Sequence, residues 1–341
     1  MKKTLIALAA VVATSAAFAQ SSVTLYGVAD IAVGDTNAKT PAGANADSIR
    51  ALASSSLNNG NSRIGFRGVE DLGGGLKAGF NFEQNVSLAD GSTGNGPTTA
   101  SSSDVDTFQR AANMFVSGGF GEVRLGRQLT TSFHSVNAWE LTGAANYSVV
   151  ASQFGFAGQG SRDDALIRYI SPAFGGFTVS AATVLKGNDA NSAVAGEQNK
   201  YDLAATYTAG PIAASIAYNK VQRGNEGMAL GGRYDFGMFK VAASYHNNEN
   251  TTGQIRSEGF TVGAGATLGP VALTLDVARD TEFKDTNWVL EAKYPLSKRT
   301  FVYGVVTEDG KRAAKAATAS NVAATAAPSV RGFALGVRHN F

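Results

Sequence analysis

The chain ends with the sequence GFALGVRHNF at residues 332–341, which alternates regularly up to its last residue. Alternate residues form two sets, each called a parity here. The odd positions, Phe333, Leu335, Val337, His339 and Phe341, are mostly apolar, whereas the even positions hold small or polar residues. Because alternate side chains of a β-strand point to opposite faces, this pattern predicts a strand with one apolar face. Chain ends usually fray unless they are held, so a strand that persists to the carboxylate needs a partner strand.

The same two-residue period recurs along the chain. Half-polar strands of this kind are predicted at 22–33, 176–185, 200–208, 211–221, 238–247, 269–280 and 287–295. Short Gly- and Pro-rich turns, such as DLGGG at 71–75, alternate with long polar segments, such as 129–161. This alternation predicts an up-and-down meander of sixteen strands, with tight turns at one end and long loops at the other.

An open meander of this length would expose two unpaired edges, which invite aggregation. Closure into a barrel removes both edges and pairs the C-terminal strand with the first strand, near Val23 to Ala32. A barrel of about sixteen strands is too wide for side chains to fill. The apolar parity must then face lipid while polar residues line a channel. The predicted fold is therefore all-β: a transmembrane antiparallel up-and-down β-barrel.

The N-terminal residues have the features of a secretory signal. Two lysines precede an apolar stretch, and Ala17-Phe18-Ala19 forms an A-x-A cleavage box, so residues 1–19 are predicted to be removed. The full chain has 29 Lys and Arg against 27 Asp and Glu, and Lys2 and Lys3 lie in this signal. The mature chain is therefore formally neutral, which argues against a nucleic-acid partner. With no cysteine and 3 histidines, the chain is predicted to hold no metal or other cofactor.

Several motifs together resemble the trimeric general porins of Gram-negative bacteria, of the neisserial and β-proteobacterial type. They are SSVTLYGVADIAV after the signal, SRIGFRGVEDLGGGLKAGFNFEQ at 62–84, FGEVRLGRQ at 120–128, ISPAFGGFTVSAA at 170–182 and the ending GVRHNF. The resemblance implies a homotrimer in the outer membrane, surrounded by lipid and lipopolysaccharide, with both termini in the periplasm. It also implies that the outer-membrane assembly machinery reads the terminal Phe341.

The resemblance assigns residues 20–341 to the barrel and residues 129–161 to a third long loop that folds into the lumen and narrows it. In this family, basic wall residues face acidic groups on that loop. The apolar neighbours Ile64 and Phe66 direct Arg63 and Arg67 to the lumen. The same parity argument applies to Arg124 and Arg168, and the basic cluster is completed by Arg110, which matches a wall arginine of the family.

The loop is poor in acids, so the acidic half of the site is assigned to Glu140, Asp163 and Asp164. A dominant basic cluster lowers the barrier for anions, which predicts a slight anion preference. Arg127 has the outward parity, where a charge is costly unless it is close to the membrane interface or to a partner, so it is a candidate for a subunit interface.

These features predict a porin through which small hydrophilic solutes and ions diffuse passively. A substrate-specific channel is the main alternative, although the lumenal parity carries charges of both signs, which favours general diffusion. A membrane-barrel enzyme would need acid and base residues that converge at the barrel top, and the three histidines have no such partners at telling spacing. An adhesin with a plugged lumen would be recognised by its lack of conductance.

Overall fold

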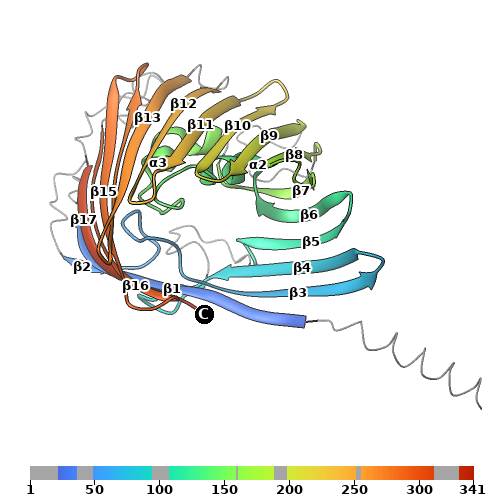
Figure 1. Ribbon diagram of the computed structural model, residues 1–341, viewed down its shortest axis with the longest axis horizontal. Coiled ribbons are helices and arrows are strands. Elements are labelled where there is room, and N and C mark those ends of the chain that lie inside the picture. Colours follow the sequence, from blue (N-terminus) through green and yellow to red (C-terminus); the bar gives the residue numbers. More distant parts are fainter. Residues whose placement is uncertain are drawn as a thin grey trace, which may run out of the picture.

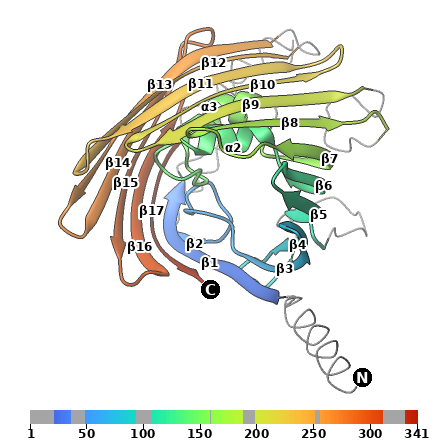
Figure 2. The same ribbon diagram turned by 45° about the vertical axis from the view of Figure 1, so that its right-hand side comes forward.

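The computed structural model describes residues 22–36, 49–93, 107–158, 160–187, 198–250, 255–310 and 330–341. These residues form one closed antiparallel sheet that curves around a wide interior (Figures 1 and 2). Sixteen long strands form the barrel wall. The three-residue strand β2 pairs with residues Ala32 to Gly34 of β1. The predicted barrel is confirmed. The predicted signal at residues 1–19 lies outside the described residues.

Each long strand pairs with its neighbours in chain order. The strands are β1 (Ser22–Thr36), β2 (Arg50–Leu52), β3 (Arg63–Gly73), β4 (Leu76–Asn85), β5 (Ala111–Gly118), β6 (Gly121–Leu129), β7 (Arg162–Ile170), β8 (Phe177–Val184), β9 (Lys200–Ala209), β10 (Ile212–Val221), β11 (Glu226–Asp235), β12 (Phe239–Asn250), β13 (Ile255–Leu268), β14 (Val271–Asp280), β15 (Asp285–Pro295), β16 (Thr300–Asp309) and β17 (Val330–Asn340). Two helices, α2 (Thr131–Asn137) and α3 (Val149–Gly158), lie between β6 and β7.

The barrel closes where β17 pairs with β1. The register runs from Val28 opposite Asn340 to Thr36 opposite Gly332. Beyond it, the backbone N–H of Gly27 donates to the Phe341 carbonyl at 3.0 Å, and that of Phe341 donates to the Gly27 carbonyl at 3.1 Å. The terminal strand is therefore held to its last residue by the first strand, as its unbroken alternation predicted.

Removal of Phe341 should weaken this closure. The change deletes two backbone hydrogen bonds, each with a net value of about 1 kcal/mol. We expect a smaller folded fraction, measured as the heat-modifiable band on semi-native gels after refolding into lipid. Phe174→Ala, at an exposed turn residue, serves as the control and should fold as the unmodified chain does. An unchanged folded fraction without Phe341 would contradict a role of this residue in closure.

The apolar parity faces outward. Leu335 is 72 % exposed, Met114 63 % and Val262 56 %, whereas their neighbours Ala334 and Asn113 are buried within the barrel. A band of exposed apolar side chains on a closed sheet is the arrangement that lipid requires, because backbone groups are paired and only apolar atoms meet the acyl chains. No helix in the described part of the chain is long and apolar enough to cross a membrane.

The described part of the segment 129–161 lies inside the barrel rather than above it. Figure 2 shows α2 and α3 within the ring of strands, where α2 contacts β8 to β11 and α3 contacts β10 to β15. Trp139 is the anchor of this packing: its side chain is 1 % exposed, and its indole N–H donates to the Ser215 hydroxyl at 2.9 Å. The close approach needs Gly231, where a Cβ would meet the indole ring at 2.3 Å.

Candidate functional site

Polar contacts attach helix α2 to the wall. The Thr130 side chain caps the helix by accepting from the Phe133 backbone N–H at 3.1 Å. The carboxylate of Asp202 accepts from the Ser132 backbone N–H at 2.9 Å and from the Ser132 hydroxyl at 2.6 Å. The Asp202 carboxylate on β9 thus holds the start of the loop against the wall.

A second set of contacts holds the middle of the loop. The Tyr147 hydroxyl donates to the Glu291 carboxylate on β15 and accepts from the Asn59 side-chain amide at 2.7 Å. Glu140 is buried and accepts from Thr142, Ser148 and the Ala144 backbone N–H, all in the same loop. The Glu140 carboxylate therefore shapes the loop and does not form an ion pair with the wall arginines.

Two adjoining cavities separate this loop from the wall of β3 to β7. One has a volume of about 450 Å³ and the other about 400 Å³, and Glu83, Leu129, Arg110 and Arg162 line both. The charged side chains of the two linings are Arg63, Arg110, Arg124, Arg162, Arg168 and Arg338, together with Glu83 and Glu122. Six arginines against two glutamates leave an excess of four positive charges in the described lining.

Arg63 and Arg110 share one carboxylate. The Arg110 Nε donates to Glu83 at 2.6 Å, and the Arg63 Nε lies 3.4 Å from the same side chain. Arg110 also donates to the Asn85 side chain at 3.0 Å. Because one glutamate compensates only one of two guanidinium charges, this pair keeps a net positive charge on the wall.

Two further arginines, Arg162 and Arg338, join this group and were not among the predicted site residues. The Arg162 Nε donates to the Arg110 carbonyl at 2.9 Å, and Arg338 donates to the Asn59 side chain at 2.7 Å. Arg338 lies on the even, lumenal positions of the last strand, so the alternation of the sequence could have identified it as a wall residue. Arg162 begins β7 at a loop end, where parity is undefined.

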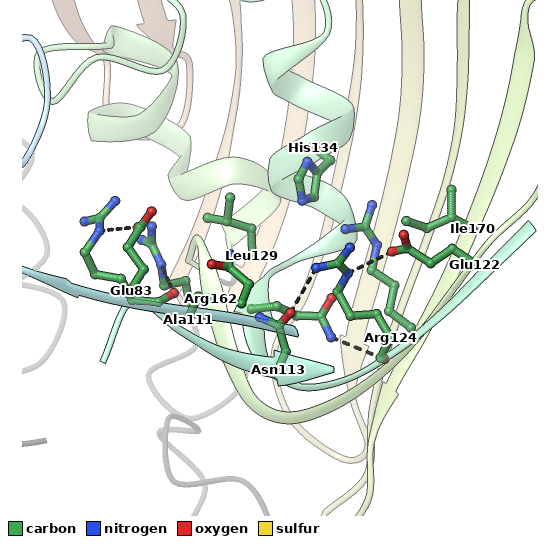
Figure 3. Close-up of a pocket in the computed structure, with 13 residues that line it drawn as sticks. Glu83, Ala111, Asn113, Glu122, Arg124, Leu129, His134, Arg162 and Ile170 are labelled. Carbon is green, nitrogen blue, oxygen red and sulfur yellow. Dashed lines mark hydrogen bonds and ion pairs between the residues drawn. The ribbon is translucent and has the colours of Figure 1, made fainter. Parts of the chain in front are cut away.

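Arg168 and Arg124 line the smaller cavity, which has a volume of about 400 Å³. Arg168 donates to the Ser180 hydroxyl at 3.0 Å, and Arg124 donates to Glu122 at 2.8 Å. Figure 3 shows His134 projecting from helix α2 toward this cavity, above Arg124 and Glu122. The predicted arginines Arg63, Arg110, Arg124 and Arg168 thus all lie between the loop and the wall.

His134 adds no charge to this site at neutral pH. The His134 side chain is exposed to the cavity, yet desolvation by the surrounding protein, with repulsion from Arg168, Arg124 and Arg162, lowers the pKa of His134 to about 3. His134 should therefore contribute no change in ion selectivity between about pH 8 and about pH 5, because it stays neutral throughout.

Reversal potentials in a KCl gradient at both pH values test this prediction. A histidine with the ordinary pKa of 6.5 would gain a positive charge on acidification and increase the anion preference. His134→Gln is the matched control, since it cannot titrate. A pH-dependent preference that His134→Gln abolishes would contradict the lowered pKa.

The remaining predicted residues have other partners. Asp163 is buried and forms an ion pair with Lys200 at 2.6 Å. Asp164 forms its ion pair with Arg127, next to an irregularity in the pairing of β6 and β7. Arg127 therefore has a partner within its own chain. Arg67 lies over the Tyr26 ring at 5.0 Å and lines neither cavity.

The irregularity explains why parity was insufficient here. Gly126 pairs with Leu166, but Gln128 pairs with Asp163, so β7 has one extra residue in this interval. Such a bulge changes which face later side chains meet, and sequence periodicity cannot locate it. In the described residues, no group of His, Asp and Glu is arranged to hold a metal ion.

Comparisons with known proteins agree with this architecture. A family model for Gram-negative porins matches residues 4–314. Outer membrane porin protein 32 of Delftia acidovorans is 32% identical over 372 aligned positions, covering 100% of both chains. Major outer membrane protein P.IB of Neisseria sicca is 35% identical over 184 positions, covering 53% of this chain and 46% of that one. The solved structure of an anion-selective porin from Comamonas acidovorans superposes with a TM-score of 0.72 at 27% identity, covering 94% of this chain and 100% of that chain.

The family match and these relatives indicate a passive channel rather than an enzyme. The closed barrel, its outward apolar band and the lined passage inside it fit that conclusion. The chain belongs to the Gram-negative porin family and is an outer-membrane porin with a transmembrane β-barrel.

Proposed function

We propose that the passage between residues 129–161 and the wall of β3 to β7 is the constriction of this porin, and that it favours anions over cations. Small hydrophilic solutes cross it by diffusion down their own gradients. The observation that carries the proposal is the excess of four positive charges in the lining of the two cavities. Rings of arginine lower the electrostatic barrier for anions and raise it for cations.

The contacts of the loop support the sign of this preference. Glu140 directs its carboxylate into the loop itself, and Asp163 pairs with Lys200. The acidic half of a balanced electrostatic sieve is therefore engaged elsewhere, whereas Arg162 and Arg338 are hydrogen-bonded to neutral groups. The solved Comamonas relative is named an anion-selective porin, which supports the same sign of preference.

A planar bilayer experiment tests the proposal. The mature chain is refolded, inserted into a bilayer and placed in a KCl gradient, and the reversal potential is measured. We expect the potential to shift toward the chloride equilibrium potential. A shift toward the potassium potential, or a folded barrel that does not conduct, would contradict the proposed constriction.

We further propose that the mature chain, residues 20–341, assembles as a homotrimer, as the resemblance to trimeric porins implies. The small outer side chain of Ala29 supports close packing of protein against this face, whereas Gly27 beside it is covered by the Phe341 ring of the same chain. The intrachain pairing of Arg127 with Asp164 leaves no unpaired charge that requires a subunit contact there. Native mass spectrometry of the refolded protein distinguishes a trimer from a monomer.

A further inference from the structure

The larger cavity has two walls of different chemistry. Its barrel side carries Arg63, Arg110, Arg162 and Arg338. Its loop side carries the apolar side chains Phe133, Ala144, Ala145, Ala151 and Phe156. Among the described residues that line this cavity, the only carboxylate is Glu83, which lies on the arginine side and contacts Arg63 and Arg110. Asn137 and Asn146 also lie on the loop side, so the passage is basic on one side and has apolar and amide groups on the other.

The two aromatic rings of the loop side pack against each other. The centroids of Phe133 and Phe156 lie 4.7 Å apart, with the ring planes inclined by 54°. Phe156 occupies a backbone conformation that residues with a side chain rarely adopt, with φ 55°, between Gly155 at 58° and Ala157 at 65°. Such conformations persist only where surrounding contacts impose them, and they concentrate at functional sites.

Contacts from the wall maintain that conformation. The Asn219 side-chain amide donates to the Ala157 carbonyl at 3.0 Å, and the Asn248 amide donates to the Phe154 carbonyl at 3.0 Å. These two bonds fix the backbone on either side of Phe156. The chain thus holds an aromatic ring at the edge of the passage, at the cost of an unfavourable backbone geometry.

The guanidinium groups opposite have donors to offer an incoming anion. Arg162 donates to the Arg110 carbonyl and the Ser161 hydroxyl, and Arg338 donates to the side chains of Asn59 and Asn340. All of these acceptors are neutral. Planar guanidinium groups bind carboxylates through paired charge-assisted hydrogen bonds, which are stronger than bonds to neutral acceptors.

We propose that the larger cavity is a subsite for aryl carboxylates, an inference that rests on the proposed anion-preferring constriction. The carboxylate of the solute meets Arg162 and Arg338, while its ring packs against Phe133 and Phe156. Aromatic pairs gain free energy beyond simple area burial, so the subsite distinguishes an aryl carboxylate from a small aliphatic one of equal charge. The volume of about 450 Å³ falls within the usual range for pockets that bind small organic ligands.

Blockade of chloride current by benzoate and by acetate tests this subsite. In a planar bilayer with KCl, each anion is titrated and its half-blocking concentration is measured. We expect benzoate to block at a concentration about five-fold lower than acetate, as one aromatic contact provides. Cyclohexanecarboxylate should fall between them, because its ring is apolar but not aromatic.

Phe133 variants separate the aromatic contact from charge. Phe133→Ser should remove the difference between benzoate and acetate, whereas Phe133→Leu should keep an apolar wall and retain part of it. Phe115→Ser is the matched control, because the Phe115 ring lies 4.5 Å from the Arg124 guanidinium carbon but lines neither cavity. This control should leave the ratio of half-blocking concentrations unchanged.

The outcomes distinguish this inference from the proposed function. If chloride preference is present but benzoate and acetate block equally, the subsite is refuted and the constriction stands. If benzoate still blocks more strongly in Phe133→Ser, the aromatic wall is refuted as its cause. Absence of chloride preference in the same recordings would instead overturn the proposed constriction.

Discussion

Replacement of Arg63, Arg110 and Arg168 by glutamate should convert the channel from anion preference to cation preference. Each substitution changes the local charge by two units, so the excess of four positive charges in the described lining becomes an excess of two negative ones. Barriers for ions in a narrow pore follow the sign of such lining charges. The reversal potential in a KCl gradient should therefore change sign.

Glutamine substitutions at the same three positions separate the effect of the new negative charge from the effect of losing an arginine. The corresponding glutamine substitutions remove only three charges, which leaves one positive charge in excess, and should weaken the preference without reversing it. Glutamine variants also guard against a misfolded barrel, since they introduce no new charge near Glu83 and Glu122.

Arg67→Glu is the positional control for this series. Arg67 lies on β3 with the same parity as Arg63, yet it lines neither cavity. Its replacement should change the reversal potential much less than Arg63→Glu does. Equal effects of the two substitutions would show that selectivity arises along the whole lumen rather than at the proposed constriction.

The sequence determines the wall of the barrel more completely than its interior. Period-two alternation reports which face meets lipid, and Leu335, Val262 and Met114 are exposed as that rule requires. The closing pair of strands could also be predicted, because alternation up to Phe341 implies a partner for the last strand. Both features follow from the two-residue repeat of a β-strand, which depends only on neighbouring residues in the sequence.

The interior depends on contacts between residues far apart in the sequence, which no periodicity encodes. Glu140 has neutral partners within its own loop, and Tyr147 reaches Glu291 across 144 positions of sequence. Arg162 is the first residue of β7 and reaches the Arg110 carbonyl, 52 positions earlier in the sequence. The basic side of the constriction could be predicted from parity, whereas the partners of the acidic residues depend on how distant parts of the chain meet in the fold.

Trp139→Ala should detach the loop from the wall. Trp139 is buried among Val136, Val150 and Ala229, and truncation of a buried tryptophan typically costs about 3–5 kcal/mol. A loss of about 3 kcal/mol shifts the equilibrium between attached and detached loop by about 100-fold. We expect a larger and noisier single-channel conductance and a weaker anion preference, because the loop no longer narrows the passage.

Trp288→Ala is the matched control for this substitution. Trp288 is the other tryptophan of the chain, and its indole N–H donates to Glu308 on the neighbouring strand rather than to any part of the loop. Its loss should leave the conductance unchanged.

Gly231→Val provides an independent route to the result expected for Trp139→Ala, because a side chain at Gly231 occupies the space of the Trp139 ring. If both Trp139→Ala and Gly231→Val conduct as the unmodified porin does, contacts elsewhere hold the loop, and Tyr147 with Glu291 is the pair to test next, since it joins the middle of the loop to β15.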